Sequence, residues 1–421
     1  MDQQSYTRYK TLDKCRLCNS KDLSTFIEFG DFPLAGAFLK QSEIEDEKLF
    51  PMGMQFCNSC SCVQVDTVIP MDILFKNYFY FSSAIQTLKD HFGELADELI
   101  ESHLKEKSLV VEIGCNDGVF LRHLAKNKIA HVGVDPATNV LKSIKEENLN
   151  VINSGFGLKV TKQIENKYGK ADAVVSSFSF AHIDDMQDVM SGVKSILNED
   201  GVFIFEIYYL GVVITEKQYD MMYHEHMSYY TIKCLDIFLG KYGFEIYDIK
   251  KIKLRSGSLR FYAQKKATGT NEISNEVNIL RNEENKKGLT VYKTYKNYGV
   301  SIKKTKDDLL NVLNEIKQKK QNVIGYGASG RATVIMNYCG IGNDYLDYVV
   351  DDAPAKTGYF TPGTHCRITT WDEVESSDIK PDYALIFAWP FIDEVKKKRI
   401  NFLKQGGKFI VPLPDVKIID S

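Results

Sequence analysis

The 421-residue sequence has no long run of apolar residues and no segment that resembles a secretion signal. A membrane-spanning helix needs roughly 18 or more consecutive apolar residues, and no stretch reaches that length. The first ten residues, MDQQSYTRYK, are polar, whereas a signal peptide has an apolar core. We therefore expect a cytoplasmic protein with no membrane partner.

The sequence also lacks a strong excess of charge of one sign. Its 53 lysines and arginines nearly balance 56 aspartates and glutamates, which gives a formal net charge of −3. Nucleic-acid-binding domains carry a basic excess, so this balance argues against a nucleic-acid partner. Internal repeats and low-complexity segments are missing as well. With 44% hydrophobic and 26% charged residues, the chain should form two or three globular domains, as a monomer or small homo-oligomer.

The nine cysteines are an odd number and are not spaced like a disulfide framework. Four fall in two C-x-x-C pairs, Cys15 and Cys18 in CRLC and Cys57 and Cys60 in CNSC, with 38 residues between the pairs. In a reducing compartment this arrangement is typical of metal ligands. Four thiolates fill the tetrahedral shell of Zn²⁺, so we predict a structural zinc site. Two unrelated pairs of reduced cysteines are the alternative, and Cys62 is a further thiol nearby.

Sequence patterns divide the chain into three blocks, which we take as domains over residues 1–85, 86–265 and 266–421. The first holds both C-x-x-C pairs and is predicted to be irregular. The second begins with an amphipathic helix and then alternates β-rich runs with helical stretches, the pattern of a largely parallel sheet flanked by helices. The third starts with charged helical residues over about 270–320 and continues as a second α/β unit. We therefore predict an α/β protein with two Rossmann-like units behind a zinc-binding module.

A loop of small residues follows the apolar run VVEI, and it has the features of a nucleoside-cofactor site. An acidic residue at the end of the next run, about twenty residues on, is placed to accept hydrogen bonds from a ribose. The loop lacks the full G-x-G-x-x-G, whose second glycine makes room for a pyrophosphate. It therefore favours S-adenosylmethionine, whose amine suits nearby acids, over a dinucleotide; a strand–helix turn without ligand is the alternative. The candidate residues are Glu112, Gly114, Cys115, Asn116, Asp117, Gly118 and Asp135.

The stretch YHEHMSYY concentrates titratable side chains after the predicted fifth strand. A methyl donor at the sheet edge needs a nucleophile, and a carbon beside a ketone must first lose a proton. In this interpretation His226 is the base, Glu225 orients an imidazole or raises its basicity, and Tyr223 donates to the developing enolate oxygen. His182 follows the fourth strand and should face the same edge of the sheet. A surface loop or an adventitious metal site is the alternative for the HEH segment.

These motifs occur together in the sugar C-methyltransferases, which the chain resembles from about residue 10 to residue 415. The resemblance rests on CRLC, FGDFPLAGAFL, PMGMQFCNSC, VEIGCNDG, VGVDPA, FAHIDD, YHEHMSYY, SGSLR, YCGIG and PGTH, in this order. Members of this family methylate a carbon of a nucleotide-linked 4-keto-deoxy sugar, and the best-known act in tetronitrose biosynthesis. The resemblance implies a central class I methyltransferase domain, zinc on the four paired cysteines, and S-adenosylmethionine at residues 114–118.

The resemblance also implies roles for individual residues. It places Tyr223, Glu225 and His226 in the active site with His226 as the base, together with His182 and one tyrosine of NYFYFSS. We favour Tyr80 over Tyr78; packing in a core is the alternative for this pair. The sugar-nucleotide contacts expected in the SGSLR motif are Gly257, Ser258 and Arg260.

The sequence departs from the family pattern at three places near the expected substrate pocket. Ser256 replaces a glycine in the SGSLR motif, and GYGASGRAT stands where the family has a loop like GAxAKG. Pro390 stands where an asparagine commonly follows the tryptophan of AWPF. These differences bear on which sugar is bound and not on the class of reaction.

The third block contains a complete G-x-G-x-x-G, which by itself predicts NAD binding. The helix that follows such a loop can also hold the diphosphate of a sugar nucleotide, because its first N–H groups are free. We predict sugar-nucleotide contacts at Gly327, Ser329, Gly330 and Arg331. The alternatives are an NAD-dependent oxidoreductase, in which Asp351 or Asp352 would bind the ribose, an O-methyltransferase on a sugar or small metabolite, and a non-enzymatic zinc-binding adaptor.

Overall fold

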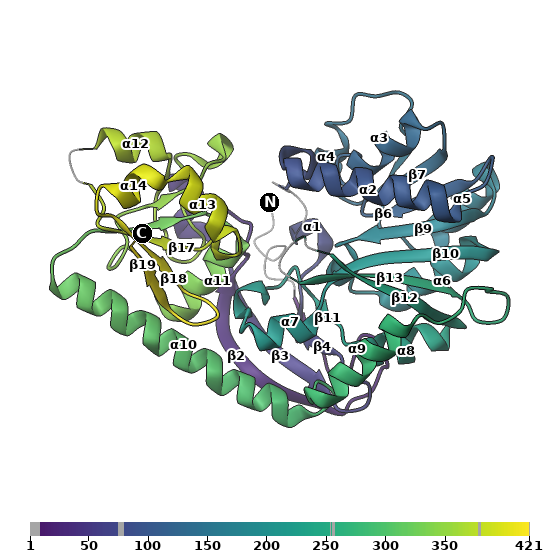
Figure 1. Ribbon diagram of the computed structural model, residues 1–421, viewed down its shortest axis with the longest axis horizontal. Helices are drawn as coiled ribbons and strands as arrows, with labels where there is room; N and C mark the ends of the chain where they lie inside the picture. The colour runs from purple at the N-terminus through teal and green to yellow at the C-terminus, as the bar shows by residue number, and fades with distance from the viewer. Residues whose placement is uncertain (1–8, 75–79, 253, 255–256, 378–379, 421) are drawn as a thin grey trace.

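The computed structural model describes residues 9–74, 80–252, 254, 257–377 and 380–420. Figure 1 shows two α/β lobes, with the long strands of the amino-terminal module and helix α10 running beneath them. No helix in these ranges is both long enough and apolar enough to cross a membrane.

The amino-terminal module is an antiparallel sheet with the strand order β11-β4-β3-β2. The prediction that this block is irregular was wrong. Strand β2 changes register between Thr25 and Ile27 and again between Glu28 and Gly30. Such bulges interrupt the alternation of apolar and polar residues by which a strand is found in a sequence. The elements are β1 (Lys10–Thr11), β2 (Leu23–Pro33), β3 (Leu49–Cys57), β4 (Val63–Val65), β5 (Thr67–Val68), α1 (Met71–Leu74) and β11 (Ser228–Tyr229).

Strand β11 belongs to the central block in sequence but completes the sheet of the amino-terminal module. It pairs with β4, Ser228 opposite Gln64 and Tyr229 opposite Val63. The segment just before it, residues 223–226, is therefore held at the junction between the zinc-binding module and the central domain.

The central domain is a seven-stranded sheet with the order β12-β13-β10-β9-β6-β7-β8, and β13 is antiparallel to its neighbours. The order reverses direction at β6, next to β9, and a ligand crevice forms at such a point outside the carboxyl ends of the strands. Its strands are β6 (Leu109–Ile113), β7 (Ala130–Asp135), β8 (Val151–Asn153), β9 (Ala171–Ser177), β10 (Leu197–Tyr208), β12 (Phe244–Ile252) and β13 (Ser258–Lys265).

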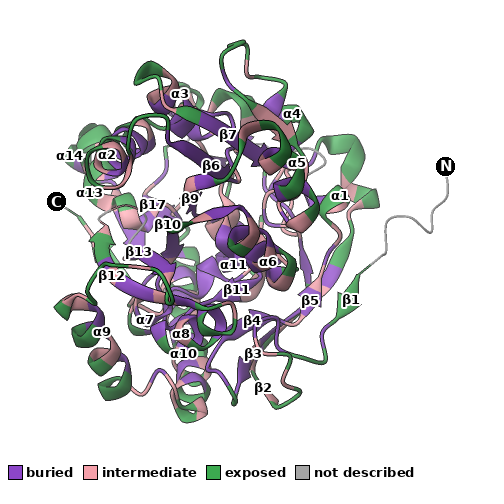
Figure 2. Cartoon of the chain, turned by 90° about the vertical axis from the view of Figure 1, so that its right-hand side faces the viewer, coloured by how far each residue is buried: buried purple, intermediate pink, exposed green. Residues whose placement is uncertain are grey.

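Helices cover both faces of this sheet. Helix α2 begins with residue 86 as predicted, and its apolar face, including Leu88, Leu95 and Leu99, is buried. Figure 2 shows the buried residues concentrated on strands such as β6, β7 and β10, while the outer helix α9 is largely exposed. The helices are α2 (Gln86–His103), α3 (Val119–Lys126), α4 (Thr138–Leu141), α5 (Leu158–Tyr168), α6 (Met186–Ile196), α7 (Leu210–Thr215) and α8 (Ile232–Lys241). Short 3-10 turns are formed by Ser82–Ala84, Phe180–His182 and Tyr219–Met221.

Helices α9 (Asn275–Lys286) and α10 (Tyr292–Gln318) open the third block. The buried residues of α10 run from Tyr295 to Ile316 at spacings of three and four, so one face of the helix packs on the core. The ring of Tyr295 stacks on Phe56 of β3 with centroids 4.6 Å apart. The long helix is thereby fixed to the zinc-binding module as it passes between the lobes (Figure 1).

The carboxyl-terminal domain is a six-stranded sheet with the order β16-β15-β14-β17-β18-β19, parallel except for β19. The α/β architecture predicted for this block is confirmed. Its strands are β14 (Val323–Tyr326), β15 (Val349–Val350), β16 (Ile368–Thr369), β17 (Tyr383–Ile386), β18 (Lys408–Val411) and β19 (Lys417–Ile419). Its helices are α11 (Gly330–Cys339), α12 (Trp371–Ser376), α13 (Ile392–Lys398) and α14 (Ile400–Lys404), with 3-10 turns at Pro354–Lys356 and Trp389–Phe391.

Candidate active site and metal centre

The four paired cysteines gather at one point of the amino-terminal module. The sulfurs of Cys15 and Cys60 lie 3.5 Å apart, as do those of Cys18 and Cys57, and all four lie within 4.8 Å of one another. Sulfurs on a tetrahedral zinc ion are about 3.8 Å apart, given zinc–sulfur bonds of roughly 2.3 Å. The donor set therefore fits Zn²⁺ with a closed shell. Cys62 lies outside this cluster, and its thiol faces backbone carbonyl oxygens.

The loop after β6 is shaped by a glycine that no other residue can replace without strain. Gly114 has φ +72°, and a Cβ at this position would lie 2.4 Å from Cβ of Ser179. The Ser179 hydroxyl is itself fixed, because it donates to the carbonyl oxygen of Ile113 at 2.6 Å. The loop and the segment after β9 therefore approach each other closely at the ligand edge of the sheet.

Asn116 and Asp135 organise the rest of this loop. The carboxylate of Asp135 accepts the backbone N–H of Asn116 at 2.9 Å and that of Ala137 at 2.8 Å. Burial raises the pKa of Asp135, and these two hydrogen bonds oppose that shift. The Asn116 side chain donates to the carbonyl oxygen of Tyr80 at 3.1 Å and accepts the N–H of Ser82 at 2.9 Å. The cofactor loop thus anchors the segment that carries Tyr80.

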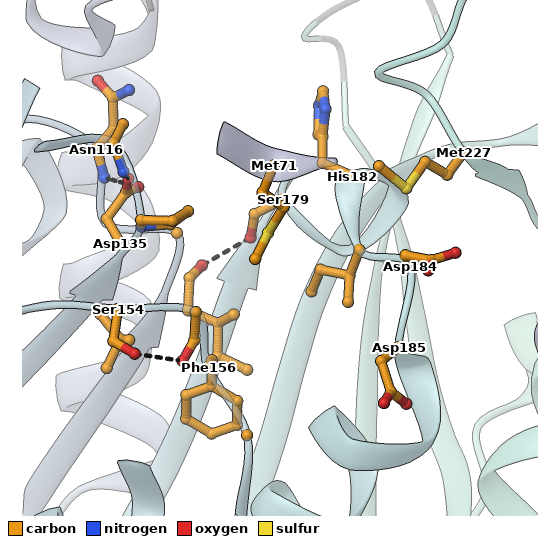
Figure 3. A pocket seen from close by; sticks show the side chains of 18 of the residues that line it. Met71, Asn116, Asp135, Ser154, Phe156, Ser179, His182, Asp184, Asp185 and Met227 are labelled. Carbon is orange, nitrogen blue, oxygen red and sulfur yellow. Dashed lines mark hydrogen bonds between the residues drawn. The ribbon is translucent and has the colours of Figure 1, made fainter. Parts of the chain in front are cut away.

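A cavity of about 610 Å³ opens beside this loop, lined by Gly114, Asn116 and Asp135 among others. Figure 3 shows Asn116 and Asp135 on one side of it and His182, Asp184 and Met227 on the other. Further acidic residues lining it are Asp185 and Asp188, and apolar side chains such as Phe156 and Ile183 complete its wall. The excess of carboxylates suits a positively charged ligand, as the sulfonium and amine of S-adenosylmethionine require.

Four of the predicted cofactor residues do not line this cavity: Glu112, Cys115, Asp117 and Gly118. Asp117 accepts the N–H of Ser83 at 3.2 Å, and Gly118 caps α3 with φ +79°. Within the described part of the chain, Oε2 of Glu112 is buried without a hydrogen-bond partner. Burial, with Asp135 and Asp117 close by, raises the pKa of Glu112 well above its usual value. These four residues support the loop without lining the cavity, and their direct contact with a cofactor stays a prediction.

His226 lies at the centre of a second group of side chains. Its Nδ1 donates to the carbonyl oxygen of Met221 at 2.7 Å, which leaves Nε2 as the acceptor. The hydroxyl of Tyr223 donates to Nε2 at 2.8 Å. The rings of His182 and Tyr208 lie 4.9 Å and 5.1 Å away, centroid to centroid. The Met221 carbonyl orients this imidazole, and the role predicted for Glu225 stays a prediction.

The environment keeps both imidazoles neutral. Burial, with His182 adjacent, lowers the pKa of His226 well below its usual value. Burial also lowers the pKa of His182 to about 4, and among the described residues its Nδ1 has no hydrogen-bond partner. Burial raises the pKa of Glu225 to about 7, opposed by a hydrogen bond from the backbone of Gly36. The cluster therefore offers neutral bases and a carboxyl group that titrates near neutrality.

A second cavity of about 600 Å³ contains this cluster, and Tyr80 and His182 line both cavities. Tyr208, Tyr223, Glu225 and His226 come from the central domain, and Ser329, Gly330, Arg331, Lys356, Pro390 and Phe391 from the carboxyl-terminal domain. Residues 34–39, which follow β2, form a third wall. The first cavity can thus hold a donor that reaches a substrate in the second. Tyr78 lies outside the described residues.

Arg331 and Lys356 bring positive charge to this second cavity. Arg331 donates to Asp220 at 2.9 Å and lies over the ring of Trp389. Lys356 donates to the carbonyl oxygen of Ala328 at 2.6 Å and pairs with Asp351 at 3.1 Å. The amino terminus of α11, capped by Ser329, opens on the same cavity, whereas Gly327 does not line it.

Of the SGSLR residues, Ser256 lies outside the described residues, and Gly257, Ser258 and Arg260 line neither cavity. Ser258 and Arg260 lie on β13, and the Arg260 guanidinium forms ion pairs of 2.7 Å with both Glu206 and Glu98. Gly257 has φ +93° and packs against Val212. Substrate binding by these three residues stays a prediction, and this placement makes Arg260 a buried partner of carboxylates.

The two acids that would bind the ribose of NAD are already paired. Asp351 accepts the N–H of Ala353 at 2.8 Å and binds Lys356. Asp352 pairs with Lys398 at 2.7 Å and also with Arg399. A dinucleotide would have to displace these cations, so the geometry offers the oxidoreductase alternative no support.

Some lining residues were not singled out from the sequence, among them Tyr208, Lys356, Phe391 and residues 34–39. The last of these lie in the FGDFPLAGAFL motif, which supported the resemblance without a role being assigned to it. Tyr208 ends the long strand β10, so its chemistry is not evident from a local pattern.

The fold and the two neighbouring cavities, which share Tyr80 and His182, define a two-substrate enzyme, an S-adenosylmethionine-dependent methyltransferase with a zinc-binding module. Three family models match successive parts of the chain: "Putative zinc binding domain" over residues 15–75, "Methyltransferase domain" over residues 86–249, and "C-methyltransferase C-terminal domain" over residues 253–414. C-methyltransferase NovU of Streptomyces niveus is 30% identical over 414 residues, which is 98% of each chain. The protein belongs to this C-methyltransferase family, as its sequence motifs predicted.

Two other matches each cover less than half of the chain. The mitochondrial arginine-hydroxylase NDUFAF5 of Mus musculus is 24% identical over 37% of this chain and 48% of its own. The crystal structure of the PH0226 protein from Pyrococcus horikoshii OT3 is 16% identical, with a TM-score of 0.36, over 46% of this chain and 98% of its own.

Proposed function

We propose that this C-methyltransferase acts on a nucleotide-linked 4-keto-deoxy sugar, through an enolate, in the biosynthesis of deoxysugars for surface polysaccharides or secondary metabolites. The observation that carries this proposal is the second cavity, whose lining combines an imidazole base and phenols with the cations of Arg331 and Lys356. A keto sugar joined to a diphosphate presents the matching pair, an acidic carbon and an anion. In this view residues 1–85 hold zinc, residues 86–265 bind the methyl donor, and residues 266–421 seat the nucleotide, in the cytosol.

His226 is the proposed base. When bound, S-adenosylmethionine supplies an electrophilic methyl on a sulfonium, so the carbon nucleophile needs only to lose a proton. The C–H bond beside the ketone breaks, its proton goes to Nε2 of His226, and its electron pair moves onto the ketone oxygen. Because Nδ1 is fixed on the Met221 carbonyl, Nε2 faces the cavity as a neutral acceptor. The enolate then raises the pKa of the nearby imidazole, which offsets its weak basicity in the free enzyme.

Tyr223 is the proposed donor to the enolate oxygen. Its hydroxyl now donates to Nε2 of His226, so turning it toward a substrate oxygen would free the base at the same moment. We assign Tyr80 or His182, which both line the two cavities, to assist Tyr223 at the enolate oxygen. A hydrogen bond to a developing oxyanion in a buried site contributes about 3 to 4 kcal/mol to the barrier reduction.

The diphosphate would bind where Arg331, Lys356 and the amino terminus of α11 meet. Free N–H groups at a helix start and two cations are the partners that phosphate oxygens prefer. Asp220, which is fully buried, holds the Arg331 guanidinium in place. Lys356 donates a hydrogen bond to the carbonyl oxygen of Ala328, in the loop before α11, and supplies the second cation.

Hydrogen–deuterium exchange at the substrate carbon tests the proposal without methyl transfer. The enzyme is incubated in D₂O with S-adenosylhomocysteine and a dTDP-, UDP-, GDP- or CDP-linked 4-keto-6-deoxy sugar, and NMR follows the proton beside the ketone. We expect exchange with one nucleotide sugar, and its loss in His226→Ala. With S-adenosylmethionine the product should carry a carbon-bound methyl. If no sugar is bound or exchanged, or if the methyl sits on oxygen, the proposal is wrong.

A further inference from the structure

The first C-x-x-C pair encloses an arginine whose side chain leaves the metal site. Arg16 follows Cys15, yet its side chain is only 2% exposed at the boundary between the zinc-binding module and the central domain. Its backbone stays with the module, because its N–H donates to Gln64 of β4 at 2.9 Å. The residue is therefore rooted in the zinc module and reaches into the central domain.

The Arg16 guanidinium joins three segments. Nε donates to Oδ1 of Asp184 at 3.0 Å, and Nη1 donates to the carbonyl oxygens of Val65 at 2.6 Å and Met227 at 3.1 Å. Asp184 lies two residues after His182, and Met227 follows His226 directly. Asp184 and Met227 both line the cofactor cavity, as Figure 3 shows.

We propose that Arg16 is a positioning residue, which couples the zinc module to the cofactor cavity by fixing Asp184 and the segment that carries His226. The fork of an arginine is needed, since its donors point in two directions while a lysine offers a single charged group. Two further contacts support this coupling. Gln187 of α6 donates to the carbonyl oxygen of Arg16 at 2.8 Å, and the N–H of Met227 donates to Ala181 at 2.9 Å.

The electrostatics of the cavity give this coupling a consequence for ligand binding. Asp184 has a side chain that is 41% exposed, so it can present its carboxylate to the cavity while Arg16 holds one oxygen. Without Arg16 this carboxylate would be free to rotate, and the buried carbonyl oxygens of Val65 and Met227 would lose a charged donor. Loss of one charge-assisted hydrogen bond corresponds to about a 10- to 100-fold change in an equilibrium constant.

The test compares Arg16→Met and Arg16→Lys with a control, Arg122→Met, which removes an arginine of α3 from its exposed ion pair with Glu146. Zinc content is measured by elemental mass spectrometry and S-adenosylhomocysteine affinity by calorimetry. We expect Arg16→Met to keep one zinc per chain and to bind at least about 10-fold more weakly. Arg16→Lys should recover part of that loss, and Arg122→Met should bind as the unmodified protein does.

A double-mutant cycle with Asp184→Ala measures the coupling itself. If Arg16 acts through Asp184, the loss of affinity caused by Arg16→Met should be much smaller once Asp184 is gone. Additive losses, unchanged affinity in Arg16→Met, or loss of zinc from that variant would each overturn the proposal. The experiment uses no sugar, so its outcome is independent of the proposed substrate.

Discussion

Replacing Gly114 by alanine should weaken cofactor binding by much more than backbone strain at this position would cause by itself. An ordinary contact to a Cβ is 3.4 Å or longer, whereas this one would be 2.4 Å from Ser179, so the loop or Ser179 must move by about 1 Å. Misplacement of reacting groups by about 1 Å can lower a reaction rate by about 100-fold, and we expect a loss of similar size in cofactor affinity when the loop moves as far. The positive φ adds about 1 to 2 kcal/mol of strain, and overpacking adds about 1 to 3 kcal/mol.

Gly169 provides the matched control. It also has a positive φ, +88°, but an added Cβ there would meet nothing within 4 Å. Gly169→Ala therefore carries the strain without the clash. Calorimetry with S-adenosylhomocysteine should show about 100-fold weaker binding in Gly114→Ala and unchanged binding in Gly169→Ala. Equal affinity in the two variants would refute the argument that the close approach of loop and Ser179 shapes the cofactor site.

Three further predictions concern the base, the carboxyl group and the metal. His226→Ala should lower kcat by about 100- to 10,000-fold while S-adenosylhomocysteine, for which we propose the other cavity, binds as before in calorimetry. The pKa of Glu225 is raised to about 7, so this carboxyl group is protonated below that pH. With its ionised form required for activity, kcat/KM should rise as the pH passes through about 7. The Glu225→Gln variant should not show this rise. Removal of zinc by a chelator should lower the melting temperature and weaken the binding of S-adenosylhomocysteine. The metal ligand Cys15 is next to Arg16, which we propose to hold Asp184 at the cofactor cavity. Thermal scans with and without the ligand measure both effects.

The parts of the fold that were found from the sequence depend on short-range patterns. The run ending at Gly114 and the aspartate at 135 lie within one strand–loop–helix–strand unit, so spacing alone placed them correctly at one edge of the sheet. The zinc cluster was equally accessible, because two C-x-x-C pairs have few other uses. The long strands of the amino-terminal module were missed because their bulges hide the alternation.

The parts that were not found depend on contacts between distant segments. An arginine such as Arg260 is a common ligand for phosphate. Its guanidinium, however, already pairs with Glu206 and Glu98, which are 54 and 162 residues away in the sequence. The group that orients His226 is a backbone carbonyl, and since every residue has one, the sequence does not indicate which of them accepts this hydrogen bond. Lys356 reaches the substrate cavity through the packing of the carboxyl-terminal domain against residues 34–39, so no local pattern marks it.

The pairing of β11 with β4 also bears on how the molecule is made. During synthesis strands β2, β3 and β4 emerge early, but one edge of β4 stays unpaired until residues 228–229 leave the ribosome, more than 160 residues later. An open edge of that kind invites association with other chains. Binding of zinc to the four cysteines soon after they are synthesised would stabilise strands β2, β3 and β4 during that interval. Cells starved of zinc should therefore accumulate this polypeptide as aggregates.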